Sequence, residues 1–392
     1  MKALRERSAL LLPIGWLLGC SAEVTHVEQF ALARQHSCAL LDDGAVKCWG
    51  FRGAGALGDG NPVGAGFPDF QLSAVSVRGL EGEVRQLAVG ETWSCALLRS
   101  GAVQCWGAPV GSPLLSVQDR GISPPTTVPG LEANVQSIAA NGDAACALKQ
   151  DGGVWCWGTN SAGQLAAQVG ASELPLPVAL PLPARLIAVG PVQVCAALVD
   201  NSIWCWGVKD PVFFGFLDPP IPYQDPAPVF PGILPNVAWQ ALAANRDYAC
   251  GLAPDATVHC WGYVPPVNAS DPIDFAPHAM NLGAPVAEVS LGEGYACAIL
   301  KSGALRCWGN GLALGVANTA PRDCEKSYAA CNPGTLITPY GVPEARRVGA
   351  GFYTTCAEQL DGEVLCWGEN LLGTQGIGTR WDRYQPTPVL GL

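Results

Sequence analysis

A cysteine pair with a spacing of ten residues recurs seven times along this chain, and Trp-Gly follows the second cysteine every time. The first cysteines of successive pairs are 47 to 59 residues apart. A self-similar period near 50 residues predicts a solenoid or a propeller rather than two unrelated domains. The pairs are Cys38 with Cys48, Cys95 with Cys105, Cys146 with Cys156, Cys195 with Cys205, Cys250 with Cys260, Cys297 with Cys307, and Cys356 with Cys366.

Each repeat predicts a strand followed by a hairpin. In the first repeat, apolar residues lie eleven, eight and six residues before Cys38 and are followed by a second strand-like run, and the other repeats are similar. The turn 42–44 ends on Gly44, and a three-residue hairpin loop needs positive φ at that place. In repeats four and five the same place holds Asn201 and Ala256. Of these two, asparagine adopts positive φ more readily.

The N-terminus predicts export. Residues 1–19 combine a basic start with an apolar run that is too short to span a bilayer, which is typical of a signal peptide. The run ends in Leu-Leu-Gly-Cys, which resembles the bacterial lipobox and implies lipid attachment at Cys20. An ordinary secretory signal with an incidental cysteine is the alternative. We therefore expect a signal peptide at 1–19, an anchor linker at 20–26 and the folded domain at 27–392.

The paired cysteines are interpreted as disulfides. The hairpin register places Cys38 opposite Cys48, at a separation that a disulfide can bridge. Buried thiols and metal ligands are the alternatives, and they would gain weight in a cytosolic protein. Export and the even number of remaining cysteines favour disulfides. A further pair, Cys324 and Cys331, is expected to staple an inserted loop.

The tryptophan after each second cysteine is expected to pack between repeats rather than to form a ligand cage, because large aromatic side chains dominate core packing. These seven residues are Trp49, Trp106, Trp157, Trp206, Trp261, Trp308 and Trp367.

Composition narrows the class of partner. Charged residues make up only 14% of the chain, the net charge is −11, and no Lys/Arg run occurs. Because a basic surface supplies most of the affinity for nucleic acids, we expect no nucleic-acid partner.

The repeats resemble those of the regulator of chromosome condensation family. The resemblance rests on the pattern C-A-L…D-G-x-V-x-C-W-G and on Gly-Thr-Asn-Ser-Ala-Gly-Gln-Leu at 158–165, and it covers roughly residues 27–392. It implies an all-β, seven-bladed propeller with four strands per blade. Only repeat three keeps the extended motif well, so the other outer loops are expected to be irregular.

The two ends of the chain predict a closed ring. The sequence stops where an internal repeat would continue into its first strand, and residues 27–32 supply such a strand. We therefore expect the last blade to be shared between the termini, which hides the sheet edges that an open array would expose.

No part of the sequence has the pattern of an enzyme site. The four histidines occupy unrelated repeat positions, and no nucleophile elbow, phosphate loop or zinc-protease motif occurs. We expect no catalytic residue, no cofactor and no metal site.

The sequence favours an exported, lipid-anchored, monomeric scaffold that binds an unknown protein or polysaccharide through propeller-face loops. A secreted bacterial member of the family that inhibits a β-lactamase implies this binding mode. Ser21 after Cys20 favours the outer membrane or the cell surface, with secretion as the alternative. The other hypotheses are a guanine-nucleotide exchange factor, as the resemblance to eukaryotic members implies, a secreted enzyme with its site at the propeller axis, and a purely structural envelope protein.

Overall fold

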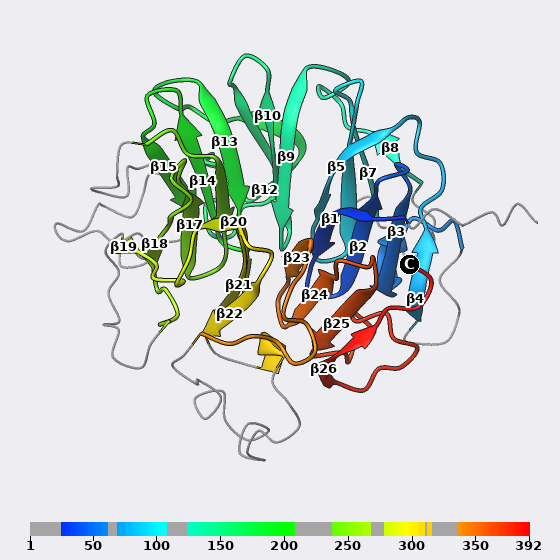
Figure 1. The fold of residues 1–392 in the computed structure, drawn as a ribbon. Helices are drawn as coiled ribbons and strands as arrows, with labels where there is room; N and C mark the ends of the chain where they lie inside the picture. The colour runs from blue at the N-terminus through cyan, green and yellow to red at the C-terminus, as the bar shows by residue number, and fades with distance from the viewer. Residues whose placement is uncertain are drawn as a thin grey trace, which may run out of the picture.

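The computed structural model describes residues 25–61, 69–107, 124–207, 237–267, 278–309, 312–315 and 336–392. Within these ranges the chain forms seven antiparallel sheets, and each sheet is made from one continuous stretch of sequence. The innermost strand of each sheet contacts the innermost strand of the next, all the way around the ring (Figure 1). The predicted all-β, seven-bladed propeller is confirmed.

Blades 1 to 4 follow one another from the N-terminus. Their strands are, in blade 1, β1 (Val27–Leu32), β2 (His36–Leu41), β3 (Val46–Phe51) and β4 (Phe70–Ser76); in blade 2, β5 (Val84–Val89), β6 (Trp93–Leu98), β7 (Val103–Gly107) and β8 (Thr126–Thr127); in blade 3, β9 (Val135–Asn141), β10 (Ala144–Lys149), β11 (Val154–Thr159) and β12 (Ala171–Pro177); and in blade 4, β13 (Ala184–Val189), β14 (Gln193–Leu198) and β15 (Ile203–Gly207).

Blades 5 to 7 complete the ring, and two short 3₁₀ helices follow the third strands of blades 1 and 6. The strands are, in blade 5, β16 (Ala241–Ala244), β17 (Tyr248–Leu252), β18 (Val258–Gly262) and β19 (His278–Ala279); in blade 6, β20 (Val286–Gly292), β21 (Tyr295–Leu300) and β22 (Leu305–Gly309); and in blade 7, β23 (Arg347–Ala350), β24 (Thr354–Glu358), β25 (Val364–Gly368) and β26 (Arg383–Pro388), with the 3₁₀ helices at Gly53–Gly55 and Leu312–Leu314.

The predicted hairpin register is confirmed. In blade 1, Cys38 pairs with Cys48 and Leu40 with Val46, and the same cysteine pairing recurs in every blade. Gly44 closes the turn with φ +81°, and Asn201 and Ala256 also adopt positive φ, at +70° and +67°. In blade 5 the turn therefore holds Ala256 in a left-handed conformation that alanine disfavours.

The glycine after each tryptophan is required by a close approach of backbones. Gly50 has φ +110°, and a Cβ there would lie 2.8 Å from both Gln35 O and His36 Cα. All seven equivalent glycines have positive φ. The Trp-Gly pair therefore lets β3 and its equivalents end tightly against the turn between the first two strands.

The hydrophobic core lies between blades rather than within one central mass. Seven clusters of buried side chains each combine residues of two adjacent blades, and one of them combines blade 7 with blade 1. Since a sheet buries its faces against its neighbours, no blade has a complete core of its own.

Polar side chains also join neighbouring blades near the axis. The Gln29 amide in β1 donates to Leu87 O and accepts from Leu87 N in β5, both at 2.8 Å. Gln86 makes the same two bonds to Ile138 in blade 3. In the opposite half of the ring, Tyr295 Oη donates to Thr354 O at 3.0 Å. The glutamine bonds fix β1 against β5 and β5 against β9, and the tyrosine bond joins the second strands β21 and β24 of blades 6 and 7.

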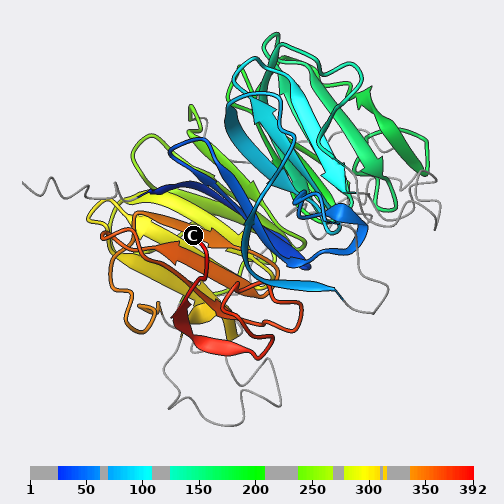
Figure 2. The ribbon, with the colours of Figure 1, turned by 90° about the vertical axis from the view of Figure 1, so that its right-hand side faces the viewer.

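The predicted shared blade is wrong in its strand assignment. The strand at 27–32 pairs with the following strand β2, and β23–β26 form blade 7 without it. The two ends nevertheless meet, because Ala74 N donates to Leu390 O at 2.7 Å and Lys47 Nζ to Gly391 O at 2.6 Å. Figure 2 shows the C-terminal segment beside blade 1. The ring closes by contact because each inner strand hydrogen-bonds to the hairpin that follows it.

Candidate functional site

The propeller has two different faces. In every blade the turn between the first and second strands lies at one edge, and in the five blades whose fourth strand is described the connection from the third strand to the fourth lies at the same edge, because the strands are antiparallel. We call this surface the loop face. The opposite surface, the hairpin face, holds the short turns between the second and third strands and the connections to the next blade. In those five blades the variable connections therefore begin and end on the loop face.

One repeat position forms a ring around the axis on the loop face. It is the fourth residue before the first cysteine of each pair, within the turn between the first two strands. Five of the seven residues are charged or aromatic. The seven residues are Arg34, Glu91, Gly142, Pro191, Arg246, Glu293 and Phe352.

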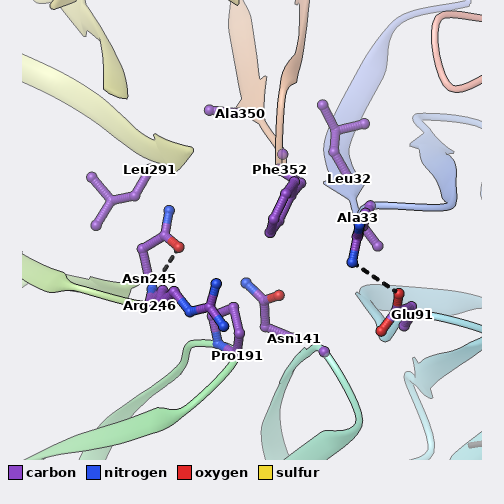
Figure 3. Close-up of a pocket in the computed structure, with 13 residues that line it drawn as sticks. Leu32, Ala33, Glu91, Asn141, Pro191, Asn245, Arg246, Leu291, Ala350 and Phe352 are labelled. Carbon is purple, nitrogen blue, oxygen red and sulfur yellow. Dashed lines mark hydrogen bonds and ion pairs between the residues drawn. The ribbon is translucent and has the colours of Figure 1, made fainter. Parts of the chain in front are cut away.

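Six of these turns, together with Leu291 of β20, line a pocket of about 140 Å³ at the axis, which we call the axial mouth. The Phe352 ring projects into it, with Arg246 and Glu91 on either side (Figure 3). The Arg34 guanidinium lies 5.0 Å from the centre of the Phe352 ring, within cation–π distance. Arg34 and Arg246 are about half or more exposed and are available to an approaching molecule.

The acidic residues at the axial mouth bind its own arginines. Glu91 Oε1 lies 3.8 Å from Arg34 Nη1 and accepts a hydrogen bond from Gln35 Nε2 at 2.9 Å. Glu293 Oε1 lies 3.6 Å from Arg246 Nη1. Burial raises the pKa of Glu293, the nearby Asp247 charge raises it further, and Arg246 opposes both effects. The mouth therefore carries mixed charge in a half-buried setting.

Comparison with known proteins identifies the repeat. The family model of the regulator of chromosome condensation (RCC1) repeat matches residues 27–52 and 135–164. The chain matches the RCC1 repeat in two of its seven repeats. It is 30% identical over 145 residues to the mitochondrial RCC1 domain-containing protein RUG3 of Arabidopsis thaliana, a match that covers 33% of this chain and 30% of RUG3.

Other relatives match over similarly short stretches. The human E3 ubiquitin-protein ligase HERC2 is 35% identical over 127 residues, covering 32% of this chain and 2% of HERC2. These matches span less than a third of each of these relatives.

Solved structures agree on the fold. Prp20p from Saccharomyces cerevisiae superposes with a TM-score of 0.72 at 19% identity, covering 92% of this chain and 87% of that one. Human WBSCR16 superposes equally well, with coverage of 88% and 93%. At these identities the likeness concerns the fold alone, and this chain has the fold of an RCC1 propeller.

The cysteine pairs of the seven repeats are disulfides in the structure. Thirteen of the fourteen cysteines are nearly or completely buried, and Cys105 is partly buried. Each bridge joins the second and third strands of one blade, so it acts within a blade and leaves the loop face to other residues. With Cα–Cα distances of 4.0 to 4.1 Å, the seven bridges join Cys38 to Cys48, Cys95 to Cys105, Cys146 to Cys156, Cys195 to Cys205, Cys250 to Cys260, Cys297 to Cys307, and Cys356 to Cys366.

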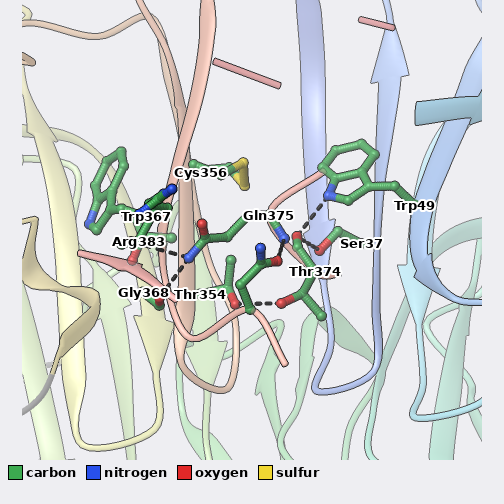
Figure 4. Close-up of a disulfide and its surroundings, with 12 residues drawn as sticks. Ser37, Trp49, Thr354, Cys356, Trp367, Gly368, Thr374, Gln375 and Arg383 are labelled. Carbon is green, nitrogen blue, oxygen red and sulfur yellow. Dashed lines mark hydrogen bonds between the residues drawn. A yellow bond between two sulfur atoms is a disulfide. The ribbon is translucent and has the colours of Figure 1, made fainter. Parts of the chain in front are cut away.

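The RCC1-repeat tryptophans lie between blades. All seven are buried. Trp49 Nε1 of blade 1 donates to Thr374 O of blade 7 at 2.7 Å, as Figure 4 shows near the Cys356 disulfide. The same bond to the preceding blade joins Trp106 to Ala56 O, Trp206 to Gln164 O and Trp367 to Ala313 O, at 2.7 to 2.9 Å. The interpretation as packing residues rather than a ligand cage agrees with this placement.

Several sequence-based expectations lie outside the described residues. They are the signal peptide at 1–19, the anchor Cys20, and the loop pair formed by Cys324 and Cys331, whose disulfide therefore stays a prediction. In the described ranges, no helix is long and apolar enough to cross a membrane, and no group of three or more His, Cys, Asp or Glu side chains could hold a metal ion.

Sequence reasoning missed the axial ring. The repeat alignment contains the signal, because all seven residues share one position relative to the cysteine. Their side chains differ from repeat to repeat, so the position does not stand out as a motif. It becomes meaningful only when the ring brings the seven turns together.

Proposed function

We propose that this chain is an exported, lipid-anchored binding scaffold that holds a protein partner against the loop face. The observation that carries the proposal is the axial mouth. Every blade contributes at least one residue to it, and a charged and aromatic set of side chains stands there on a disulfide-bridged frame. Rigid scaffolds that present variable loops commonly bind other molecules in this way.

The size of the mouth favours a macromolecular partner. Pockets for small ligands are typically about 300–1,000 Å³. The axial mouth, at about 140 Å³, is smaller than that range. It has room for one side chain projecting from a partner surface, with Arg34 and Arg246 at its rim.

The electrostatics of the mouth favour binding over catalysis. Glu91 and Glu293 are each paired with an arginine of the same mouth rather than with each other. Glu91, the acidic residue among those that line the pocket, is held by Arg34 and Gln35, and the residues of this lining include no Ser, Cys, His or Lys that could act as a nucleophile or as a second proton-transfer group. We therefore propose no catalytic role for this chain.

The fold of a related propeller supports a protein partner. Yeast RCC1 (Prp20), whose structure superposes with a TM-score of 0.72 at 16% identity, has been crystallised with the protein Kap60. That complex concerns the yeast protein. A protein with this propeller fold thus occurs in a protein complex, and a protein is the partner class proposed here.

Export and anchoring rest on residues 1–20 and on the disulfides. Seven bridges in one domain favour an oxidising compartment, because cytosolic thiols are kept reduced. Metabolic labelling with a radioactive fatty acid tests the anchor. We expect label on the wild type and none on Cys20→Ser. Unlabelled wild-type protein would exclude the anchor, and protein that is protected from protease until the cells are lysed would exclude export.

The binding face is tested by photo-crosslinking in cells. A photoreactive phenylalanine analogue replaces Phe352 on the loop face or, as a matched control, Leu360, which is 56% exposed on the hairpin face. We expect a discrete protein adduct from position 352 and none from position 360. Equal crosslinking at both positions, none at 352, or a polysaccharide smear instead of a band would each contradict the proposal.

A further inference from the structure

The loop between β25 and β26 exposes two large apolar side chains. Trp381 is 75% exposed and Leu371 is 65% exposed, the two highest values among the large hydrophobic residues of the described ranges. Both stand on residues 369–382, which we call the blade 7 loop. Single exposed apolar residues are common on protein surfaces, but two on one loop call for a physical account.

The blade 7 loop is held from within by the buried Asn370 side chain. Its Nδ2 donates to Thr379 O at 2.7 Å and to Trp381 O at 3.2 Å, and its Oδ1 accepts from Gln375 N at 2.9 Å. Gln375 is itself buried, and its Nε2 donates to Gly368 O at 2.6 Å. The hydrogen bonds of Asn370 therefore hold the loop backbone in the conformation in which Trp381 is exposed.

Blade 3 contains the same loop with different surface residues. Asn160 Nδ2 donates to Ala167 O and Val169 O, both at 2.7 Å, and its Oδ1 accepts from Leu165 N at 2.8 Å. Ser161 follows Asn160, as Leu371 follows Asn370. Val169 is the counterpart of Trp381, because the carbonyl oxygen of each residue accepts a hydrogen bond from the asparagine Nδ2 of its loop. The scaffold therefore needs neither a leucine nor a tryptophan at these two positions.

The blade 7 loop also carries a cationic group, Arg380, which precedes Trp381 in the sequence. The Arg380 guanidinium lies 4.6 Å from the centre of the Phe70 ring of blade 1, and Phe70 packs against Phe51 with ring centres 5.8 Å apart. Among the described residues Arg380 forms no ion pair, whereas nearby Arg52 is neutralised by Asp59 and Asp69 at 3.1 and 3.4 Å. Although the chain has a net charge of −11, the Arg380 guanidinium is a local positive charge that packs on an aromatic ring.

We propose that Leu371, Arg380 and Trp381 form a docking surface for a partner protein segment that presents an apolar side chain next to a carboxylate. Trp and Arg are the residues most enriched among energetically dominant interface positions. The free guanidinium selects a carboxylate by charge-assisted hydrogen bonding. Two exposed apolar side chains on one loop, Leu371 and Trp381, favour an apolar side chain over a sugar ring, whose hydroxyl groups would lose water against leucine.

This surface deepens the proposed function, on which it rests, because it lies on the loop face and defines the chemistry of a protein partner. It is separate from the axial mouth in its residues. The two proposals can therefore fail independently, and the test must distinguish them.

The test uses a random-peptide library on phage, selected against the folded, oxidised domain. We expect recovered peptides to combine an aromatic or aliphatic residue with a neighbouring Asp or Glu. The double variant Leu371→Ser with Trp381→Val gives the blade 7 loop the blade 3 surface and should weaken these peptides by more than roughly 25-fold, the effect of a hot-spot residue. Arg380→Gln should weaken them less and reduce the dependence of their affinity on salt.

Three controls decide the outcome. Unchanged near-ultraviolet circular dichroism and melting show that the variants fold, and Leu360→Ser on the hairpin face should bind the peptides normally. Peptides that lose binding with Phe352→Ala but not with the double variant would overturn this inference and leave the axial mouth standing. Peptides that lack the acidic residue would overturn it, as would retention of an acidic polysaccharide that depends on Trp381.

Discussion

His26 Nδ1 lies 2.7 Å from Glu358 Oε1, so a residue just before the first strand is bound to the second strand of the last blade. The same carboxylate oxygen accepts from Val27 N at 3.2 Å. Glu358 is completely buried, and the other six repeats have Leu, Ala or Ile at its position. The acidic side chain thus occurs only at the seam where the first and last blades meet.

This seam predicts the effect of Glu358→Gln. The substitution keeps the size of the side chain but removes the charge that binds His26 and Val27 N. Since hydrogen bonds to charged groups contribute about 1.5–3 kcal/mol, we expect the free energy of unfolding to fall by about 1–3 kcal/mol. Urea denaturation measures the loss, and hydrogen exchange should rise first in residues 26–32.

Arg346→Gln is the matched control for the seam. Arg346 Nε lies 3.8 Å from Glu358 Oε2, but the arginine side chain is 45% exposed. Because these two atoms lie beyond hydrogen-bond distance and the guanidinium is half exposed, the change should cost less than Glu358→Gln, about 0.5–1 kcal/mol. A larger effect for Arg346→Gln than for Glu358→Gln would show that the arginine, and not the N-terminal segment, is the important partner.

The hairpin turn of blade 5 contains removable strain. Ala256 has φ +67°, a conformation that costs non-glycine residues about 1–2 kcal/mol. Ala256→Gly should therefore raise the free energy of unfolding by about 0.5–1 kcal/mol after the entropy cost of glycine. The reverse change in blade 6, Gly303→Ala, has open space for its Cβ at φ +89° and should cost about 1–2 kcal/mol. Thermal unfolding of both variants tests the pair, and shifts of the same sign would contradict it.

The tryptophans of the RCC1 repeats allow a comparison between blades. Trp206 Nε1 donates to Gln164 O at 2.8 Å, whereas Trp308 Nε1 is buried and has no hydrogen-bond partner in the described part of the chain. Both Trp→Phe changes lose similar packing, but only Trp206→Phe breaks a bond and leaves a carbonyl unpaired. We expect Trp206→Phe to be more destabilising by about 1–2 kcal/mol in urea denaturation. Equal losses would mean that packing alone sets the contribution of these residues.

The structure within each blade could be predicted from the sequence because it is local and repeated. A spacing of ten residues between cysteines and a turn that ends on Gly44 define one hairpin register, and seven copies reinforce it. The disulfide geometry and the strand before each hairpin follow from the same short segment.

The contacts between blades were not predictable in the same way. The pairing of His26 with Glu358 joins residues more than 300 positions apart, and no periodic signal marks it. The axial ring has a common repeat position, yet Arg34 and Phe352 share no chemistry that a motif could reveal. The exposure of Trp381 likewise depends on a loop held by Asn370, which only the folded chain shows.

Acid stability tests a buried histidine at another blade contact. His36 in β2 is completely buried, its Nε2 lies 2.7 Å from Ser94 Oγ of blade 2, and burial lowers its pKa from 6.5 to about 4. Between these two pH values the unfolded state binds a proton that the folded state does not, so stability falls as the pH is lowered from 6.5 to 4 and is fully present above 6.5. The shift corresponds to about 3 kcal/mol at most.

The substitution His36→Gln places at this position the residue that blade 4 has there, and it should remove the part of the acid-induced loss of stability that comes from His36. Urea denaturation at several pH values measures it as the difference between the two proteins, which cancels the carboxylate contributions that they share. Parallel pH profiles for wild type and variant would show that His36 takes up its proton in the folded state as readily as in the unfolded chain.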